Sequence, residues 1–378
     1  MKDTTDSVRI IFICSALEPG RDGVGDYTRR LAAALIQTNI KCTIISLNDR
    51  YVKDNFKGTQ SVDNIDVPVL RITSILTDPE KIAFAKDYID RLAPQWLSLQ
   101  FVPFGFHVKG LKTGLSKLLL SLNTSAKWHV MIHELWVGMD KESPIKHIAW
   151  GWVQKKMISS LLKNLKPAVI TTQSQLYKQY LATMGYDAQY LPLFSNIPVN
   201  NGQILDAKTE SKNINLVIFG NIHHGAPVQA FANEVAAYAK EYNIRPTLKI
   251  LGHCGAEQDN WIKQWESAGL QVAAIGEQSA ERISAELKSA DIGIATTPVS
   301  ITDKSGSFAA MREHGLPVIS VSRPWHARGV KKILIPDGVF YYQKGNFKEF
   351  YSSMDSISSV STDVNIVSQQ LSNLLLGF

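Results

Sequence analysis

The stretch Ala290–Ser320, ADIGIATTPVSITDKSGSFAAMREHGLPVIS, predicts a strand, a polar turn, a helix and a second strand in succession. Asp291–Ala295 is a short apolar run that is typical of a buried strand. The segment Lys304–Ser307 then groups a lysine with two hydroxyls just before an apolar helix that begins at Phe308. A helix N-terminus presents unpaired backbone N–H groups and about half a positive charge. The stretch therefore predicts a phosphate-binding site.

The same stretch has a simpler interpretation as an ordinary strand–helix unit. In that case Ser305 or Ser307 caps the helix, and Gly306 serves the turn. A serine can cap a helix and line a site at once, so the neighbouring Lys304 favours the anion site. The spacing differs from the G-x-x-x-x-G-K-[ST] pattern of P-loop proteins, and no Walker A site is predicted.

Length and composition are those of a folded protein with two domains. The chain has 378 residues, which is more than one core of ordinary size needs. Its N-terminal sequence MKDTTDSVRI is polar and predicts no signal peptide, and no apolar run approaches the ~18 residues of a membrane span. Cys14, Cys42 and Cys254 are isolated in sequence, which favours a reducing, cytoplasmic compartment.

The net charge is +6, and the basic residues concentrate between Lys109 and Lys166. Such a concentration fits an anionic partner: a nucleotide, a lipid surface or a nucleic acid. Two lysine-rich helices are expected there, at about 109–122 and at 145–165. The favoured interpretation is that their leucines pack on a sheet and their lysines are solvated. The alternative is peripheral contact with the inner face of a membrane. No recognition module is present, so no nucleic-acid partner is predicted.

The N-terminal half begins as a strand–helix–strand unit. Val8–Ser15 and Lys41–Leu47 are the expected strands, with a glycine-rich loop and an amphipathic helix between them. The loop glycines Gly20, Gly23 and Gly25 are separated first by two residues and then by one, which is the reverse of the order in G-x-G-x-x-G. This spacing argues against a nicotinamide dinucleotide site, and we expect Asp49 to be a loop residue.

Strands and helices continue to alternate along the chain, which predicts doubly wound parallel sheets. A strand is expected at 190–198, and the polar segment Asn200–Asn213 then interrupts the pattern before it restarts. We therefore predict an N-terminal Rossmann-like domain over 1–205, a C-terminal Rossmann-like domain over 206–355, and a helical tail over 356–378 that packs back on the first. Two such α/β domains facing a central cleft would bind their ligand in that cleft.

With both halves laid out, the sequence resembles the GT-B glycosyltransferases, and most closely their family-4-like, nucleotide-sugar-dependent members. GRDGVGDYTRRLAAAL near the N-terminus resembles that family's glycine loop and first helix, and His133 resembles its histidine after a central strand. Ile275-Gly276 followed by SAERISAELKSADIGI, and then HGLPVIS, resemble two further segments. The similarity covers nearly the whole chain. It implies transfer of a sugar with retention at the anomeric carbon, in carbohydrate biosynthesis.

The chain also departs from the family pattern. The family usually has two glutamates eight positions apart before the G-x-P-V segment, and those positions are Thr302 and Ala310 here. It usually has an arginine and a lysine after the first strand of the second domain, where this chain reads FGNIHHGAP. We infer a rearranged site in which Lys304 replaces a lost cation. Glu313, about one helical turn after Ala310, would bind a ribose hydroxyl.

These considerations give one set of predicted site residues. The predicted catalytic residues are His133, which would contact the transferred sugar, Glu134, which would help it or else cap the next element, and Asp22, which would reach an acceptor hydroxyl. The competing interpretation of His133 as a hydrogen-bonded core histidine stays open. The residues predicted to hold the nucleotide sugar lie in glycine-rich loops or beside the anion site: Gly23, Val24, Gly25, Asn221, His224, Gly252, Gly276, Lys304, Ser305, Gly306, Ser307 and Glu313.

No metal site and no permanently bound cofactor is predicted. His129 and His133 are four residues apart on an expected strand, which separates them by about 13 Å, too far to share one ion. The donor is expected to be a UDP- or GDP-sugar, whose phosphate charge would meet helix ends and basic side chains.

The sequence favours a glycosyltransferase of the hexosyltransferase type. Its C-terminal half would hold the donor, and its N-terminal half a hydroxyl acceptor, either a glycan, a lipid-linked sugar or a small molecule. Two alternatives stay open. A nucleotide-sugar epimerase on the same fold would need acid and base carboxylates but no acceptor. A non-catalytic binding protein would have kept the fold and lost the site.

Overall fold

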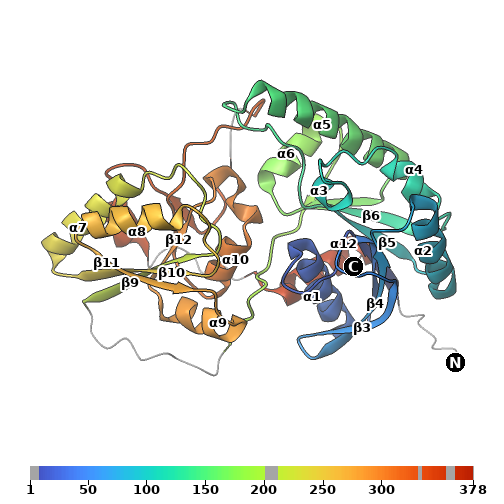
Figure 1. The fold of residues 1–378 in the computed structure, drawn as a ribbon, viewed down its shortest axis with the longest axis horizontal. Helices are drawn as coiled ribbons and strands as arrows, with labels where there is room; N and C mark the ends of the chain where they lie inside the picture. Colours follow the sequence, from blue (N-terminus) through green and yellow to red (C-terminus); the bar gives the residue numbers. More distant parts are fainter. Residues whose placement is uncertain (1–7, 201–211, 331–333, 355–361, 378) are drawn as a thin grey trace. The chain divides into compact units, whose positions relative to one another are not determined.

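The chain forms two compact units (Figure 1). The computed structural model describes residues 8–200, 212–330, 334–354 and 362–377. The first unit comprises Met1–Pro192 and Val364–Phe378, and the second comprises Leu193–Asp363. The domain boundaries predicted at 205/206 and 355/356 lie outside the described residues.

The first unit is built on an eight-stranded sheet in the order β3-β4-β2-β1-β5-β6-β7-β8. Neighbouring strands pair in parallel, apart from the antiparallel hairpin of β3 and β4. The central strands are apolar and buried on both faces, as parallel strands covered by helices require. The strands are β1 (Arg9–Cys14), β2 (Lys41–Asp49), β3 (Phe56–Val62), β4 (Ile65–Thr73), β5 (Trp96–Phe101), β6 (Lys127–Ile132), β7 (Val169–Thr172) and β8 (Gln189–Tyr190).

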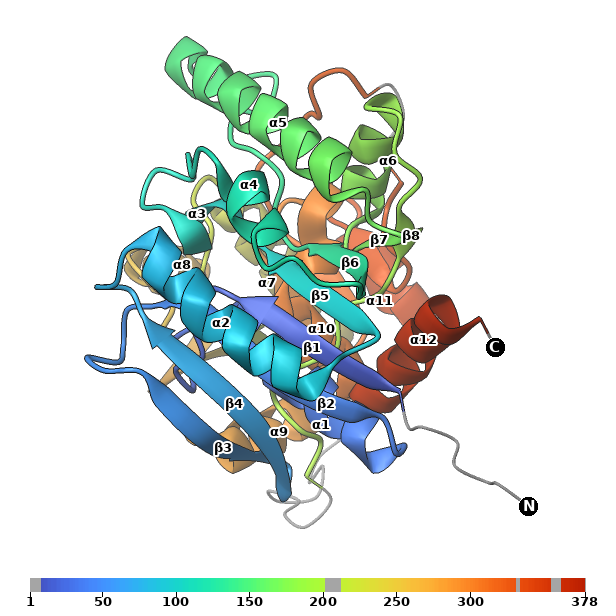
Figure 2. The ribbon, with the colours of Figure 1, turned by 90° about the vertical axis from the view of Figure 1, so that its right-hand side faces the viewer.

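Amphipathic helices cover this sheet. The last helix of the chain, α12, packs against α1, and its Val367 and Leu371 are fully buried (Figure 2). On another part of the unit, the short α4 packs against the long α5. The helices are α1 (Gly23–Gln37), α2 (Asp78–Leu92), α3 (Pro103–Phe106), α4 (Leu115–Leu120), α5 (Ile145–Leu165), α6 (Gln175–Thr183) and α12 (Val364–Leu376).

A buried ion pair lies at the end of β2. Asp49 is the last residue of this strand and has no exposed surface, so its assignment to a loop was wrong. Its Oδ2 accepts a hydrogen bond from Arg71 Nε at 2.8 Å and another from the backbone N–H of Leu17 at 3.1 Å. Burial alone would raise the pKa of Asp49, but the hydrogen bonds and the charge of Arg71 outweigh it and lower the pKa. Asp49 therefore stabilises the fold as a carboxylate.

The second unit is built on a six-stranded parallel sheet in the order β11-β10-β9-β12-β13-β14. Its strands are β9 (Asn213–Phe219), β10 (Arg245–Leu251), β11 (Gln271–Gly276), β12 (Ile292–Ala295), β13 (Val318–Ser320) and β14 (Val339–Tyr341). Its helical segments are α7 (Val228–Tyr242), α8 (Gln258–Ser267), α9 (Ala280–Ser289), the 3₁₀ turn η1 (Val299–Lys304), α10 (Gly306–Glu313) and α11 (Phe347–Ser353). Trp261 and Trp265 are one turn apart on α8, and both are fully buried in the core.

Two expected elements are shorter than predicted. The helix expected at 109–122 is reduced to α4, because Gly110 and Gly114 adopt φ angles of +62° and +77° that a continuous helix does not allow. The strand expected at 190–198 is reduced to β8. The N–H of Leu191 still donates to the carbonyl of Thr172, but Pro192 follows it and has no N–H group to continue the ladder.

Candidate functional site

The second unit has its topological switch point between β9 and β12. From β9 the chain proceeds through β10 and β11 on one side, and β12, β13 and β14 lie on the other. Ligands of parallel α/β sheets bind beyond the carboxyl ends of the strands at this point. The predicted residues Asn221 and His224 follow β9, and the segment Lys304–Ser307 follows β12. The sheet order therefore brings these two groups to the same edge.

Hydroxyl groups gather at the N-terminus of α10. Ser305 caps this helix, because its Oγ accepts a hydrogen bond from the N–H of Phe308 at 3.4 Å. The same Oγ lies 3.0 Å from Ser307 Oγ and 3.4 Å from Thr297 Oγ1. Ser307 also lies close to Gly220, at the end of β9, where an added Cβ would be 3.7 Å from the Ser307 Cβ. Capping by Ser305 is confirmed, and the capping hydroxyl belongs to a polar cluster.

Positively charged groups lie around His223, in the loop after β9. Partial desolvation of the imidazole lowers the pKa of His223, and the charges of Lys304, His224 and Arg323 lower it further. The backbone N–H of His223 donates to Thr296 Oγ1 at 3.1 Å, which fastens the loop after β9 to the end of β12. Such mutual repulsion between cations is relieved when an anion binds among them.

Arg323 is a site residue that the sequence did not single out. It follows β13 and packs against Gly225 of the loop after β9, where an added Cβ would lie 3.3 Å from the Arg323 Cβ. Nothing in the local sequence SRPWHARG marks this arginine, and only the pairing of β12 with β13 brings its loop to the same edge of the sheet as Lys304. Lys304 and Arg323 follow β12 and β13, whereas the loop after β9 contains His223 and His224 and no lysine or arginine.

Gly252 and Gly276 lie at the ends of β10 and β11. Their φ angles are +91° and +73°, and the N–H of Gly252 donates to the carbonyl of Gly276 at 2.8 Å. Asn221 lies over the adjoining loop, with Oδ1 2.9 Å from the position of an added Cβ on Gly255. These three predicted residues therefore share one edge of the sheet with the cationic group.

Glu313 is the predicted residue that the structure does not bring to the cluster. It is the last residue of α10, seven positions after Gly306, which is about 10 Å along a helix. One carboxylate oxygen accepts a hydrogen bond from the backbone N–H of Ser195 at 2.8 Å. Its predicted contact with a ribose hydroxyl stays a prediction.

The first unit has its switch point between β1 and β5. Asp22, Gly23, Val24 and Gly25 lie in the loop and first helical turn after β1. Asp22 caps α1 by accepting a hydrogen bond from the N–H of Gly25 at 2.8 Å, and burial raises the pKa of its carboxyl group. Gly25 has no room for a side chain, because an added Cβ would lie 2.6 Å from the carbonyl oxygen of Ala16.

His133 follows β6 in a buried polar network. Its side chain has 6 % of its surface exposed, Nε2 lies 2.9 Å from Gln100 Oε1, and Nδ1 lies 3.2 Å from Gln173 Oε1. Tyr27 of α1 packs edge-on against the ring at a centroid distance of 5.0 Å. This geometry matches the core-histidine interpretation, and a contact with sugar stays a prediction. Tyr27 connects His133 to the helix that Asp22 caps.

Two residues near His133 in sequence, Glu134 and His129, have different surroundings. Glu134 follows it directly and is partly exposed. His129 is buried within β6, where Ser98 and Thr171 hydroxyls lie 2.8 Å from its two ring nitrogens. Burial, with a contribution from His133, lowers the pKa of His129 to about 3, so its imidazole is neutral.

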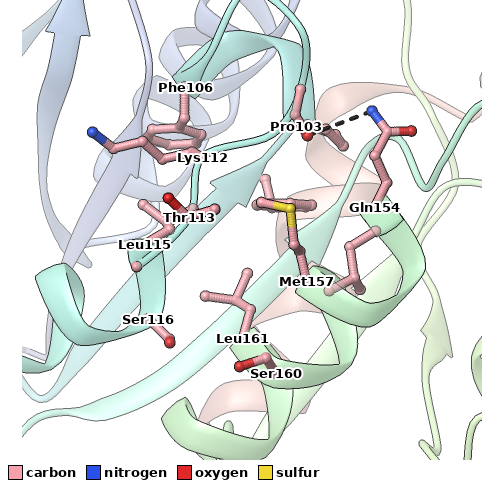
Figure 3. A pocket seen from close by; sticks show the side chains of 14 residues that line it. Pro103, Phe106, Lys112, Thr113, Leu115, Ser116, Gln154, Met157, Ser160 and Leu161 are labelled. Carbon is pink, nitrogen blue, oxygen red and sulfur yellow. Dashed lines mark hydrogen bonds between the residues drawn. The ribbon is translucent and has the colours of Figure 1, made fainter. Parts of the chain in front are cut away.

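An apolar cavity of about 230 Å³ lies in the first unit beneath α5 (Figure 3). Phe101, Phe106, Leu115, Met157 and Leu161 contribute its apolar walls. Consecutive residues of a strand point to opposite faces, so Phe101 lies on the face of the sheet away from Gln100 and His133. None of the predicted site residues lines this cavity.

Residues 8–200, 212–330, 334–354 and 362–377 contain no group of three or more His, Cys, Asp or Glu side chains arranged to hold a metal ion. Within the same ranges, every helix is too short or too polar to span a bilayer.

Comparison with known proteins gives the fold and no close relative. No protein-family model and no curated protein matches the sequence. Among solved structures, Anabaena Alr3699/HepE in complex with UDP and glucose has a TM-score of 0.56 at 13% identity, covering 98% of this chain and 100% of that one. The catalytic domain of starch synthase IV from Arabidopsis thaliana, bound to ADP and acarbose, has a TM-score of 0.55 at 11% identity, with coverage of 98% and 99%.

An epimerase is similar to the same degree. The UDP-GlcNAc 2-epimerase from Neisseria meningitidis, bound to UDP-GlcNAc, has a TM-score of 0.54 at 11% identity, covering 98% of this chain and 100% of that one. The predicted fold class is confirmed: the chain is an α/β protein of GT-B type, with two Rossmann-like domains.

Proposed function

We propose that this protein is a glycosyltransferase, family-4-like with an altered donor site, that moves a sugar from a nucleotide-diphosphate sugar to a hydroxyl acceptor. The observation that carries the proposal is the group of Lys304, Arg323, His223 and the Ser305 and Ser307 hydroxyls at the switch point of the second unit. Two cations and a helix N-terminus there suit a diphosphate.

The second unit would hold the donor. Its diphosphate would lie at the N-terminus of α10, and its base beside the turns at Gly252 and Gly276. Cations already in place would stabilise the negative charge that develops on the departing diphosphate, which is the largest contribution to catalysis in such reactions. Structures similar to this one are named as complexes with UDP or a UDP-sugar, so UDP is the nucleotide we favour.

The first unit would hold the acceptor. Asp22 would accept a hydrogen bond from the attacking hydroxyl, because its carboxyl group lies in a glycine-rich loop after β1 and has a raised pKa. His133 and Glu134 follow β6 at the same edge of the sheet, where His133 would orient the site through Gln100 and Gln173. Retention of the anomeric configuration remains an implication of the family resemblance.

A nucleotide-sugar epimerase is the second candidate, since one is named among the similar structures. The two reactions differ in their need for an acceptor. A transferase releases free sugar and UDP slowly from a UDP-sugar when acceptor is absent, whereas an epimerase returns a second UDP-sugar. Proton exchange from solvent into the recovered UDP-sugar would identify the epimerase.

Calorimetric titration with UDP, GDP, ADP and TDP tests the donor class. We expect one diphosphate to bind at least about tenfold more tightly than the others, which corresponds to about 1.4 kcal/mol. UDP-glucose and UDP-GlcNAc are then followed by NMR for release of free sugar. A protein that binds none of the four diphosphates is not a nucleotide-sugar enzyme, and binding without turnover of any donor indicates a non-catalytic binding protein.

Diphosphate binding should take up a proton at His223. Partial burial, and after it the neighbouring cations, lower the pKa of this imidazole in the free protein, and the charge of a bound diphosphate would raise it. As the pH falls from 7.5 to 6, the UDP affinity of the wild type should therefore increase relative to the UDP affinity of the His223→Gln variant. Titration in buffers of different ionisation enthalpy measures the proton uptake. An equal uptake by both proteins would show that it comes from the nucleotide or from another group.

A further inference from the structure

Positive charge is concentrated in one part of the first unit. Residues 91–186 contain 12 Lys and Arg against 3 Asp and Glu, a surplus of nine, although the whole chain carries only +6. This segment supplies β5 to β7 and the helices α3 to α6. The nucleotide site described above lies in the other unit, so it does not account for this charge.

The long helix α5 presents much of this charge to solvent. Its sequence IKHIAWGWVQKKMISSLLKNL has four lysines and no acidic residue. Gly151, Ile158, Leu161, Leu162 and Leu165 form its buried face. At 100° per residue, Lys156 and Lys163 lie opposite that face, and both are exposed. Figure 2 shows α5 along one edge of the unit, with α4 beside it.

Large apolar side chains are exposed among these lysines. Ile145 is 84 % exposed and Trp152 is 62 % exposed, although a helix packed on a sheet would gain by burying both. Lys156 Nζ lies 5.6 Å from the centroid of the Trp152 ring. Val108, 85 % exposed, lies in a loop that is fastened to α5 by a hydrogen bond from Trp150 Nε1 to the Lys109 carbonyl at 2.9 Å.

The combination of groups identifies the partner. Tryptophan and isoleucine partition into the boundary between lipid headgroups and acyl chains, and lysines beside them attract anionic headgroups. A surface that binds nucleic acid combines lysines and arginines, which contact the phosphates, with aromatic side chains that stack on the bases. An exposed aliphatic side chain such as Ile145 would contribute no binding energy to such a contact. An apolar, leucine-rich surface of a partner protein would be expected to bind an apolar face without lysines, and the exposed face of α5 mixes apolar side chains with lysines.

The cavity beneath α5 supports the same partner. It is mostly apolar, and Thr113, Gly114 and Ser160 in its lining are exposed, so it opens at the surface beside α5. Dry apolar cavities of this order of size accept small hydrocarbons. A segment of one aliphatic chain could enter beneath the helix whose outer face meets the headgroups.

We propose that the exposed face of α5, with Ile145, Trp152, Lys156 and Lys163, binds the surface of an anionic lipid bilayer. The helix would lie in the plane of the interface, with the apolar side chains inserted among the acyl-chain ends and the lysines at the phosphates. An acceptor held in that membrane would then be presented to the first unit. The binding itself does not depend on the proposed glycosyl transfer.

Sedimentation of the full chain with sucrose-loaded vesicles tests the proposal. Vesicles of phosphatidylcholine with 30 mol% phosphatidylglycerol should carry the protein down at about 0.1 M salt, and vesicles of phosphatidylcholine alone should not. Because each lysine near such a surface contributes about 1 kcal/mol, Lys156→Gln with Lys163→Gln should weaken partitioning about 25-fold. Trp152→Ala should also weaken partitioning, and the partitioning that this variant retains should still decrease as salt is added.

The matched control is Lys240→Gln with Lys263→Gln, two exposed lysines on α7 and α8 of the second unit. This variant has the same net charge as the test variant and should partition like the wild type. An equal loss of partitioning in the test and control variants would show that only net charge matters, and it would overturn the proposal. A wild type that does not sediment with anionic vesicles would also overturn it. Light scattering that shows a dimer dissociated by Trp152→Ala would assign the face to a second copy instead. UDP titration of every variant keeps the donor site under separate observation.

Discussion

Replacing Lys304 and Arg323 together by alanine should weaken UDP binding about 100-fold, with each single substitution costing about tenfold. Lys304 lies in η1 after β12 and Arg323 lies in the loop after β13, and both are near enough to His223 for their charges to lower its pKa. A charge-assisted hydrogen bond to phosphate contributes about 1.5 to 3 kcal/mol, and tenfold in affinity is about 1.4 kcal/mol. Calorimetric titration at constant salt measures the loss.

Three controls limit the interpretation of that loss. Lys240→Ala with Lys263→Ala removes the same charge from exposed positions on α7 and α8 of the same unit and should leave the dissociation constant unchanged. Lys304→Arg should retain most of the affinity, because the cation is kept. Thermal unfolding without nucleotide, measured for every variant, separates a loss of stability from a loss of the anion site. Undiminished UDP affinity in the double variant would place the diphosphate elsewhere.

Asp49→Ala should lower the free energy of unfolding by about 3 to 5 kcal/mol, the usual loss when one partner of a buried ion pair is removed. After the substitution Arg71 still pairs with Glu18, at 2.7 Å, but it has lost the buried carboxylate of Asp49, and the N–H of Leu17 has lost its acceptor. Urea unfolding followed by circular dichroism measures the change. Asp49→Leu with Arg71→Met should recover much of it, because an apolar pair of similar volume leaves no buried charge.

The exposed pair of Lys86 and Asp90 on α2 is the comparison, with a 2.7 Å separation and both side chains at least one-third exposed. Asp90→Ala should change stability by no more than about 0.5 kcal/mol.

The pKa of Asp49 is lowered in the folded state, so its contribution to stability is fully present above the unfolded pKa of about 3.9 and is lost as the pH falls through the folded pKa. The difference in free energy of unfolding between the wild type and Asp49→Ala should accordingly become smaller below pH 4. A difference that does not change with pH would show that packing rather than charge is responsible.

The fold could be predicted because its signals are local. Buried parallel strands are short, continuous apolar runs, and β1, β2 and β12 were each expected within a few residues of their observed bounds. The antiparallel β3 was missed, because FKGTQSV alternates polar residues on a largely exposed edge. Apolar periodicity also predicted too long a helix at 109–122, where two glycines with positive φ override it.

The candidate site could be predicted only in part, for a related reason. The group at Lys304 to Ser307 is contiguous and has a recognisable helix N-terminus. Arg323 is 19 positions further on in an unremarkable loop, and only the strand order places it there. The network of His133 likewise joins residues from β5, β6 and the loop after β7, and the cavity beneath α5 depends on how two helices pack.

The position of α12 has a consequence for how the protein is made. Its Val367 and Leu371 cover α1, yet about 170 residues of the second unit are synthesised between the strands of the first unit and this helix. At about 5 to 20 residues per second, the apolar face of α1 would wait roughly ten to thirty seconds on the ribosome for its cover. A nascent chain stalled within the second unit would expose that face, which makes it a binding site for chaperones that the finished protein no longer displays.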